Sequence, residues 1–431
     1  MSWFKPMVRA LHTWPCTLAP SLRASPSSGL LDQVARVTAE GLPPSLPVTL
    51  TTKLRDDRER INFTSSSTYV TTREGGVDTA GQAPVSGSYS GVHSSGPLWS
   101  LRPEPGSVRR LWPGDITQPL DYTLTLTDTA SKDLLATTSI TRSYLSEGVR
   151  RVEVREEGFV GTLFLPPHPT PAPAIITLYG GVTRAGVPED RAAMLASKGY
   201  ASLALAYFGV GDLPKVYGEL DIEYFERAAL WLLQRPEVAG GGVGLCGISM
   251  GGNICLAMAH FLGQLVAAVA VLGANYVSSP GGFKYKKEVV EGSSYIADPN
   301  AALLGRDGWL EGGTEVLFSQ PERQIIFEKS EAPVLGIVGE EDEEMREIAR
   351  FSFERAQQSG KVNCRLVELE GTGHLIDLPH SPLCQAASHP LCLPHQRMWY
   401  GGQVQPHALA QFQAWTLLTQ FFDGHLKRIK L

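Results

Sequence analysis

One serine, Ser249, stands between two glycines in the run Gly247-Ile248-Ser249-Met250-Gly251. This G-x-S-x-G spacing is typical of a sharp strand-to-helix turn that presents a nucleophilic serine, because only glycine fits the cramped flanking positions. An apolar run precedes the motif, and small residues at helical spacing follow it. The alternative is a glycine-rich turn with an incidental serine. We expect Ser249 to be the nucleophile of an acyl-transfer reaction.

A serine hydroxyl becomes a good nucleophile only when a base removes its proton, so the chain must also supply that base. In hydrolases with this turn an acid and then a histidine follow the serine, each at the end of a later strand. His374 fits this order, because it comes after a strand pattern and two glycines in "ELEGTGHLIDLP". The other histidines fall in tails, linkers, loops, helices or the N-terminal half: His12, His93, His168, His260, His380, His389, His395, His407 and His425.

The acid is expected after the apolar run at 333–339, where residues 340–344 are all acidic. Five carboxylates cannot all be buried beside one histidine, and most of them should open a helix, where negative charge is favourable. The residues alone leave two candidates for the acid, Glu341 and Asp342. Its role would be to fix the tautomer of the imidazole and to stabilise the imidazolium.

Acyl transfer also needs two backbone N–H groups to bind the oxyanion. One is expected from Met250, the residue after the nucleophile. The other should come from the loop after the apolar run at 172–178, at Tyr179, Gly180 or Gly181, and we choose Gly180. The alternative for these glycines is a plain turn.

Two different patterns divide the chain after a short leader. Residues 23–153 contain period-two runs, such as 47–54 and 121–128, separated by Gly, Ser and Pro, which predicts a β-sandwich. Residues 154–431 alternate apolar strand-length runs with helical segments, which predicts a doubly wound, mostly parallel α/β sheet with Ser249 on a βα turn. Residues 1–22 hold basic but no acidic residues and are expected to be an organelle transit peptide or a disordered tail.

The bulk composition excludes several other classes of function. With 431 residues the chain should form two or three domains, and its net charge of −6 does not favour nucleic-acid binding. The six cysteines show no metal-ligand spacing, so no metal site is expected. No run reaches the roughly 18 apolar residues that a membrane span needs, so no stable membrane insertion is expected.

Beyond these motifs, the chain resembles the family of type I acyl-CoA thioesterases and bile acid-CoA:amino acid N-acyltransferases. The likeness runs through stretches such as "LDIEYFERAALWLLQRPEVAGGGVGLCGISMGG", "GTGHLIDLPHSPLC" and "SGSYSGVHSSGPLWSLRPEP", and it covers nearly everything after about residue 25. The resemblance implies a β-sandwich N-terminal domain, an α/β-hydrolase catalytic domain and a Ser-Asp-His triad. The aspartate that closes the family's "VGxDD" run falls on Asp342, so the resemblance selects Asp342 as the acid.

The family divides by its nucleophile, with cysteine in the amino-acid conjugating members and serine in the thioesterases. Ser249 therefore implies hydrolysis of fatty acyl-CoA to free fatty acid and CoA, with water as the acyl acceptor and no cofactor. Three alternatives stay open: an N-acyltransferase that conjugates glycine or taurine, a carboxylesterase of the same fold, and a hydrolase-like binding module without catalytic activity. The elbow of the family commonly has a lysine where this chain has Met250. This chain is therefore expected to lack a positive charge beside the site.

The phosphates of CoA need positive partners, and the best local cluster is Lys284, Lys286 and Lys287. The alternative for these lysines is a solvated surface run. We expect a monomer located in the mitochondrial matrix, with cytosol and peroxisome as alternatives. The C-terminus "KRIKL" ends like a peroxisomal signal, but Ile429 replaces the small residue of that signal.

Overall fold

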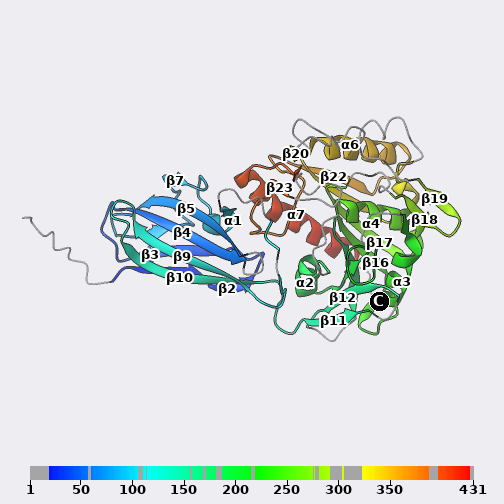
Figure 1. Cartoon of the computed structure of the whole chain (residues 1–431), viewed down its shortest axis with the longest axis horizontal. Coiled ribbons are helices and arrows are strands. Elements are labelled where there is room, and N and C mark those ends of the chain that lie inside the picture. Colours follow the sequence, from blue (N-terminus) through cyan, green and yellow to red (C-terminus); the bar gives the residue numbers. More distant parts are fainter. Residues whose placement is uncertain are drawn as a thin grey trace, which may run out of the picture.

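The computed structural model describes residues 19–427, apart from 57–59, 105–109, 113, 156–157, 168–170, 181–186, 215–218, 275, 277–280, 292–302, 305–322 and 388–396. Most of the leader expected at residues 1–22 therefore lies outside the described residues. Two N-terminal sheets lie at one end of the molecule, and a larger sheet flanked by helices lies at the other (Figure 1).

The N-terminal half consists of strands and one helical turn, α1 (Gly96–Trp99). Its larger sheet contains β2 (Ser28–Leu30), β10 (Leu134–Ser143), β9 (Leu120–Asp128), β4 (Pro47–Asp56), β5 (Ile61–Val70), β7 (Ser86–Gly87) and β8 (Arg102–Pro103). Its smaller sheet contains β1 (Ser21–Ser25), β3 (Arg36–Glu40) and β6 (Val77–Asp78). The period-two runs expected as strands are confirmed by β4 and β9, and buried side chains of both sheets, such as Val37 and Leu50, share one cluster.

Eight strands form the sheet of the C-terminal half, in the order β11 (Arg150–Val154), β12 (Val160–Leu165), β14 (Ala201–Ala206), β13 (Ala172–Leu178), β16 (Val238–Ile248), β17 (Val266–Leu272), β21 (Val334–Gly339) and β22 (Cys364–Leu369). The strands from β14 to β22 run parallel, whereas β12 is antiparallel to both its neighbours. This is an α/β-hydrolase-like sheet. Because β11 pairs with β12, the sheet already begins at Arg150, slightly before the expected boundary at residue 154.

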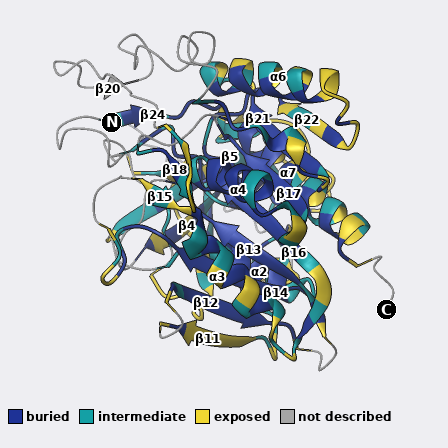
Figure 2. Ribbon diagram, turned by 90° about the vertical axis from the view of Figure 1, so that its right-hand side faces the viewer, coloured by how far each residue is buried: buried dark blue, intermediate teal, exposed yellow. Residues whose placement is uncertain are grey.

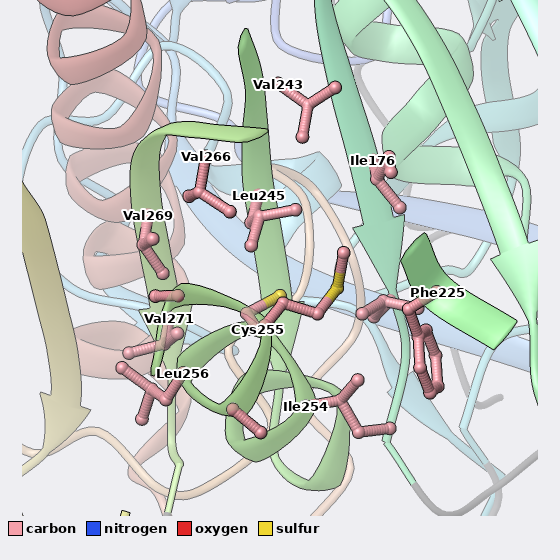
Figure 3. Packing of buried hydrophobic residues seen from close by; sticks show 14 of the residues in the cluster. Ile176, Phe225, Val243, Leu245, Ile254, Cys255, Leu256, Val266, Val269 and Val271 are labelled. Carbon is pink, nitrogen blue, oxygen red and sulfur yellow. The ribbon is translucent and has the colours of Figure 1, made fainter. Parts of the chain in front are cut away.

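Helices cover both faces of this sheet, so its central strands are buried on both sides, whereas the edge strand β11 is mostly exposed (Figure 2). One face packs against α3 (Ile222–Leu233), α4 (Met250–Phe261) and α6 (Glu343–Gln358), and the other against α2 (Asp190–Ser197) and α7 (Val404–His425). Side chains alternate accordingly along β16, with Leu245 on the first face and Cys246 on the second. Leu245 belongs to one cluster with Cys255 and Leu256 of α4 (Figure 3).

Small elements complete the C-terminal half. They are β15 (Leu220–Asp221), β18 (Phe283–Tyr285) and β19 (Glu288–Val290) in one sheet, β20 (Leu303–Leu304), β23 (Ala386–Ala387) and β24 (Arg397–Trp399) in another, and the 3₁₀ turns η1 (Gly263–Leu265) and η3 (Phe327–Lys329). No helix in the described part of the chain is both long and apolar enough to span a membrane.

The long helix α7 also packs against the N-terminal half. Its Ala408 belongs to the cluster between the two N-terminal sheets, and its Trp415 indole donates a hydrogen bond of 2.9 Å to Asp32. Lys198, next to α2, pairs with the same Asp32 at 2.5 Å. The two halves are therefore joined by apolar and by charged contacts, on the face of the sheet that carries α2 and α7.

Candidate active site

The backbone at Ser249 has the strained geometry of a nucleophile elbow. Ser249 joins β16 to α4 with φ 51° and ψ −123°, a conformation that L-residues rarely adopt. A Cβ on Gly247 would overlap the backbone of Gly251, and a Cβ on Gly251 would overlap the Leu178 carbonyl at the end of β13. Both glycines of the motif are therefore required by the close approach of helix and strands.

The structure brings Ser249, His374 and Asp342 together in one hydrogen-bonded chain. His374 Nε2 lies 3.0 Å from Ser249 Oγ, and His374 Nδ1 lies 2.7 Å from Asp342 Oδ2. The three residues follow β16, β22 and β21, whose parallel carboxyl ends meet at the same edge of the sheet. This is the geometry in which a histidine takes the serine proton while a carboxylate orients the ring.

Packing fixes the position of the His374 ring. The ring stacks on Tyr400 at a centroid distance of 5.6 Å and an interplanar angle of 16°. The backbone N–H of His374 donates to the Tyr400 carbonyl. The His374 side chain is 13% exposed and the Asp342 side chain 9% exposed. His407, from α7, holds the chain on both sides of the ring, since its Nδ1 accepts from Gly373 N–H and its Nε2 donates to the Leu375 carbonyl.

The carboxylates of the acidic run separate into different roles. Only Asp342 of this run has a described contact with the His374 imidazole. Glu341 instead accepts hydrogen bonds from Gly402 N–H at 2.8 Å and from the Gln403 amide at 2.6 Å. The two candidates that the residues left open are thus distinguished by geometry, because neighbouring side chains on this turn point in different directions.

The electrostatics of the site stabilise the imidazolium form of His374. Burial disfavours the imidazolium, but the charge and hydrogen bond of Asp342 outweigh burial and raise the pKa of His374 above 6.5. Both ring nitrogens of His407 bond to backbone groups, and burial lowers its pKa despite the nearby charges of Asp377 and Glu341. Burial likewise lowers the pKa of His380 to about 4.

The two expected oxyanion donors both lie close to Ser249. Met250 is the first residue of α4, so its N–H has no partner four residues earlier in the helix. Gly180 is buried against the elbow, where a Cβ on it would lie 3.0 Å from Ser249 Cβ and 3.5 Å from Ser249 Oγ. Of the two other candidates, Tyr179 directly precedes Gly180, and Gly181 lies outside the described residues. The assignment of Met250 and Gly180 as donors stays a prediction.

The three lysines expected to bind CoA lie on the β18–β19 hairpin. Tyr285 of this hairpin contacts Phe261, at the end of α4 opposite Ser249. A helix of 12 residues is about 18 Å long, so the hairpin is well removed from the nucleophile. Lys284 lies 3.9 Å from Glu219, and Lys286 lies over the Tyr285 ring. A CoA-binding role for the three lysines stays a prediction.

Sequence reasoning missed a group of buried charged residues beside this site. Arg110, from the N-terminal half, binds Asp377 and the Tyr179 hydroxyl. The two ends of the pair are 267 residues apart, and although Asp377 lies in the stretch "GTGHLIDLPHSPLC", nothing in that stretch points to Arg110. Among the described residues no group of three or more His, Cys, Asp or Glu side chains is arranged to hold a metal ion.

Two family models match the chain. The model described as "BAAT / Acyl-CoA thioester hydrolase C terminal" matches residues 220–428, and "Acyl-CoA thioester hydrolase/BAAT N-terminal region" matches residues 32–156. Acyl-coenzyme A thioesterase 2, mitochondrial, from Homo sapiens is 38% identical over 424 residues, which cover 96% of this chain and 86% of that protein.

Two further relatives are similar over almost their whole length. Acyl-coenzyme A thioesterase 1 from Homo sapiens is 38% identical over 406 residues, which cover 92% of this chain and 94% of that protein. Bile acid-CoA:amino acid N-acyltransferase from Mus musculus is 34% identical over 420 residues, which cover 94% of this chain and 97% of that protein.

Replacing Asp342 by Asn should lower the pKa of His374, because the carboxylate that offsets the burial of the imidazole is removed. Glu341→Gln is the matched control, and it should leave the pKa unchanged because Glu341 contacts Gly402 and Gln403 instead. NMR titration of the His374 ring in both variants measures the effect. A larger shift in Glu341→Gln than in Asp342→Asn would show that Glu341 is the acid.

Proposed function

Because the chain belongs to the family of acyl-CoA thioester hydrolases and bile acid-CoA:amino acid N-acyltransferases, we propose that it hydrolyses fatty acyl-CoA to free fatty acid and CoA. The observation that carries this proposal is the hydrogen-bonded chain from Asp342 through His374 to Ser249 on a strained elbow. No step of the proposed reaction calls for a cofactor.

In the first half-reaction Ser249 Oγ attacks the thioester carbonyl, and His374 Nε2 takes the hydroxyl proton. Asp342 stabilises the imidazolium, in line with the raised pKa of His374. The backbone N–H groups of Met250 and Gly180 bind the oxyanion. The C–S bond then breaks, and the CoA thiolate takes the proton from His374 and leaves as the thiol, which returns the imidazole to its neutral form. The product is an acyl ester on Ser249.

In the second half-reaction His374 Nε2 takes a proton from water, and the hydroxide attacks the acyl ester. The ester bond breaks, His374 returns the proton to Ser249 Oγ, and the fatty acid leaves. An oxygen ester is a harder electrophile than a thioester, and water attacks it readily. A cysteine nucleophile would form a thioester intermediate that favours an amine over water. The serine oxygen therefore favours hydrolysis over conjugation with glycine or taurine.

For the N-terminal region we infer a β-sandwich, supported by the shared cluster of buried side chains from its two sheets. The proposed triad residues all come from one chain, so a monomer holds a complete site. The proposed substrate is acyl-CoA and the proposed acceptor is water. No role for a metal ion or a nucleic acid is proposed.

Ser249→Ala and His374→Ala should each lower kcat for acyl-CoA hydrolysis by about 10⁴-fold or more, because the nucleophile or its base is lost. Ser359→Ala, an exposed serine after α6, serves as the control and should keep full activity. Release of CoA is followed with a thiol reagent, and the acyl product is identified with and without added glycine or taurine. Near-normal turnover in either triad variant contradicts the mechanism, and an acyl amide as main product supports the transferase instead.

Reversing the charge of Lys284, Lys286 and Lys287 to glutamate should raise KM for acyl-CoA several-fold, because the phosphates of CoA lose positive partners. Hydrolysis of a small uncharged thioester should not change, since that substrate has no phosphates. Steady-state kinetics with both substrates measures the difference. Equal effects on the two substrates would mean that the hairpin does not bind CoA.

We propose the mitochondrial matrix as the location, with cytosol and peroxisome as alternatives. The proposal rests on the acid-free residues 1–22 and on one relative, which is named mitochondrial, whereas Acyl-coenzyme A thioesterase 1 is not. A C-terminally tagged chain should co-localise with a mitochondrial marker and lose that signal when residues 2–22 are deleted. A mitochondrial signal that survives the deletion would disprove the role of the leader.

A further inference from the structure

A buried charged cluster lies where the N-terminal half meets the catalytic half. The Arg110 side chain is 10% exposed and binds both carboxylate oxygens of Asp377, which is 9% exposed. The same guanidinium donates to the Tyr179 hydroxyl at 2.7 Å and lies over the Tyr179 ring, 5.1 Å from its centroid. Trp112 packs edge-on against the same ring at 5.5 Å. The segment 110–112 of the N-terminal half thus holds one tyrosine on two sides.

The two partners of Arg110 belong to the two loops that meet at the nucleophile. Tyr179 directly precedes Gly180, which lies against Ser249. Asp377 lies in the loop that follows His374, and its backbone N–H donates to the Leu375 carbonyl. The Tyr179 hydroxyl also lies 3.3 Å from Asp377 Oδ1, so Arg110, Tyr179 and Asp377 form a closed triangle of hydrogen bonds.

We propose that Arg110 is a positioning residue of the active site, through which the N-terminal half fixes the Tyr179–Gly180 segment relative to the loop that carries His374. This inference rests on the proposed function, because it assigns Gly180 to the oxyanion site. The Tyr179 carbonyl accepts a hydrogen bond from Tyr207 at 2.7 Å, so Tyr179 is held at its backbone from one side and at its ring by Arg110. Loss of Arg110 removes the charged contact of the Tyr179 ring and hydroxyl and leaves the Asp377 carboxylate without its cation.

The charge of Arg110 also affects the pKa of His374, the proposed base. Burial opposes the charge of Arg110, but Asp377 and Tyr179 raise its pKa well above the ordinary value, so it stays charged. As a cation it lowers the pKa of His374, against the larger effect of Asp342. The titratable and charged groups around Arg110 and His374 include Asp342, Asp377, Asp190, Arg191, Tyr179, Cys384, Tyr400 and His407.

The experiment replaces Arg110 by Met in the full-length protein and counts active sites by titration with a serine-reactive fluorophosphonate. We expect kcat per titrated site to fall about 10- to 100-fold, because the oxyanion segment loses its fixed position. KM should change little. The acidic limb of the kcat/KM profile should move to higher pH, because His374 loses a neighbouring cation and its pKa rises. A residue with only a structural role would lower the number of titrated sites and leave both readouts unchanged.

Two further variants keep the proposal testable if Arg110→Met folds poorly. Arg110→Lys keeps the charge but not the paired hydrogen bonds, so it should leave the acidic limb in place and still lose kcat. Arg110→Met combined with Asp377→Asn avoids an unpaired buried carboxylate and should keep the loss of kcat. Wild-type kcat per titrated site in both Met-containing variants would overturn the proposal.

Lys198→Met is the matched control, because it breaks another ion pair between the halves, with Asp32, away from the nucleophile. It should leave kcat and the pH profile unchanged. An equal loss of kcat in Lys198→Met would overturn the proposal in favour of general docking of the two halves. The proposed function is tested separately, since wild-type hydrolysis with an unaffected Arg110→Met variant rejects only the positioning role.

Discussion

The close approach of α4 to the end of β13 is the constraint on which the site depends. Gly251 lies against the Leu178 carbonyl, and Gly247 lies against Gly251, so neither position can carry a Cβ and the chain turns sharply between them, at Ser249. This turn gives Ser249 its positive φ and places its hydroxyl at the carboxyl edge of the sheet. The same contact brings the segment after β13 next to the nucleophile, so one packing constraint places both the serine and Gly180.

The proposed base and acid, His374 and Asp342, reach the same edge through the pairing of other strands. His374 and Asp342 follow β22 and β21, and their positions depend on the parallel pairing of β17, β21 and β22. The N-terminal half contacts this region from outside the sheet. Its Arg110 binds Asp377, and its buried side chains pack against α7, the helix that carries His407. Residues of the first half therefore contact the loops that carry the proposed site residues of the second half.

The sequence predicts those features of the site that depend on local spacing. The glycines around Ser249 and the alternation of strands and helices are patterns within short segments of the sequence. The elbow and the sheet could therefore be predicted from the sequence itself. The choice between Glu341 and Asp342 depends on side-chain direction within one turn, which the residues alone do not encode. The resemblance to a family selected Asp342, the carboxylate that contacts His374.

Long-range pairs were beyond prediction for a different reason. Arg110 and Asp377 lie far apart in the chain, and an arginine in an irregular stretch gives no periodic signal. The same holds for β11, whose exposed, polar residues read as part of the first half although its backbone pairs with β12. The positions of such residues follow from tertiary packing, which a single sequence does not display.

The central claim is that an acyl ester forms on Ser249 during turnover. Rapid-quench mixing of the enzyme with a long-chain acyl-CoA, followed by proteolysis and mass spectrometry, tests it most directly. The account predicts that the acyl group appears on the peptide containing Ser249 within the first turnover and disappears as free acid is released. Release of the free acid with no acylated Ser249 peptide at any time, or with the acyl group on another residue, would contradict it.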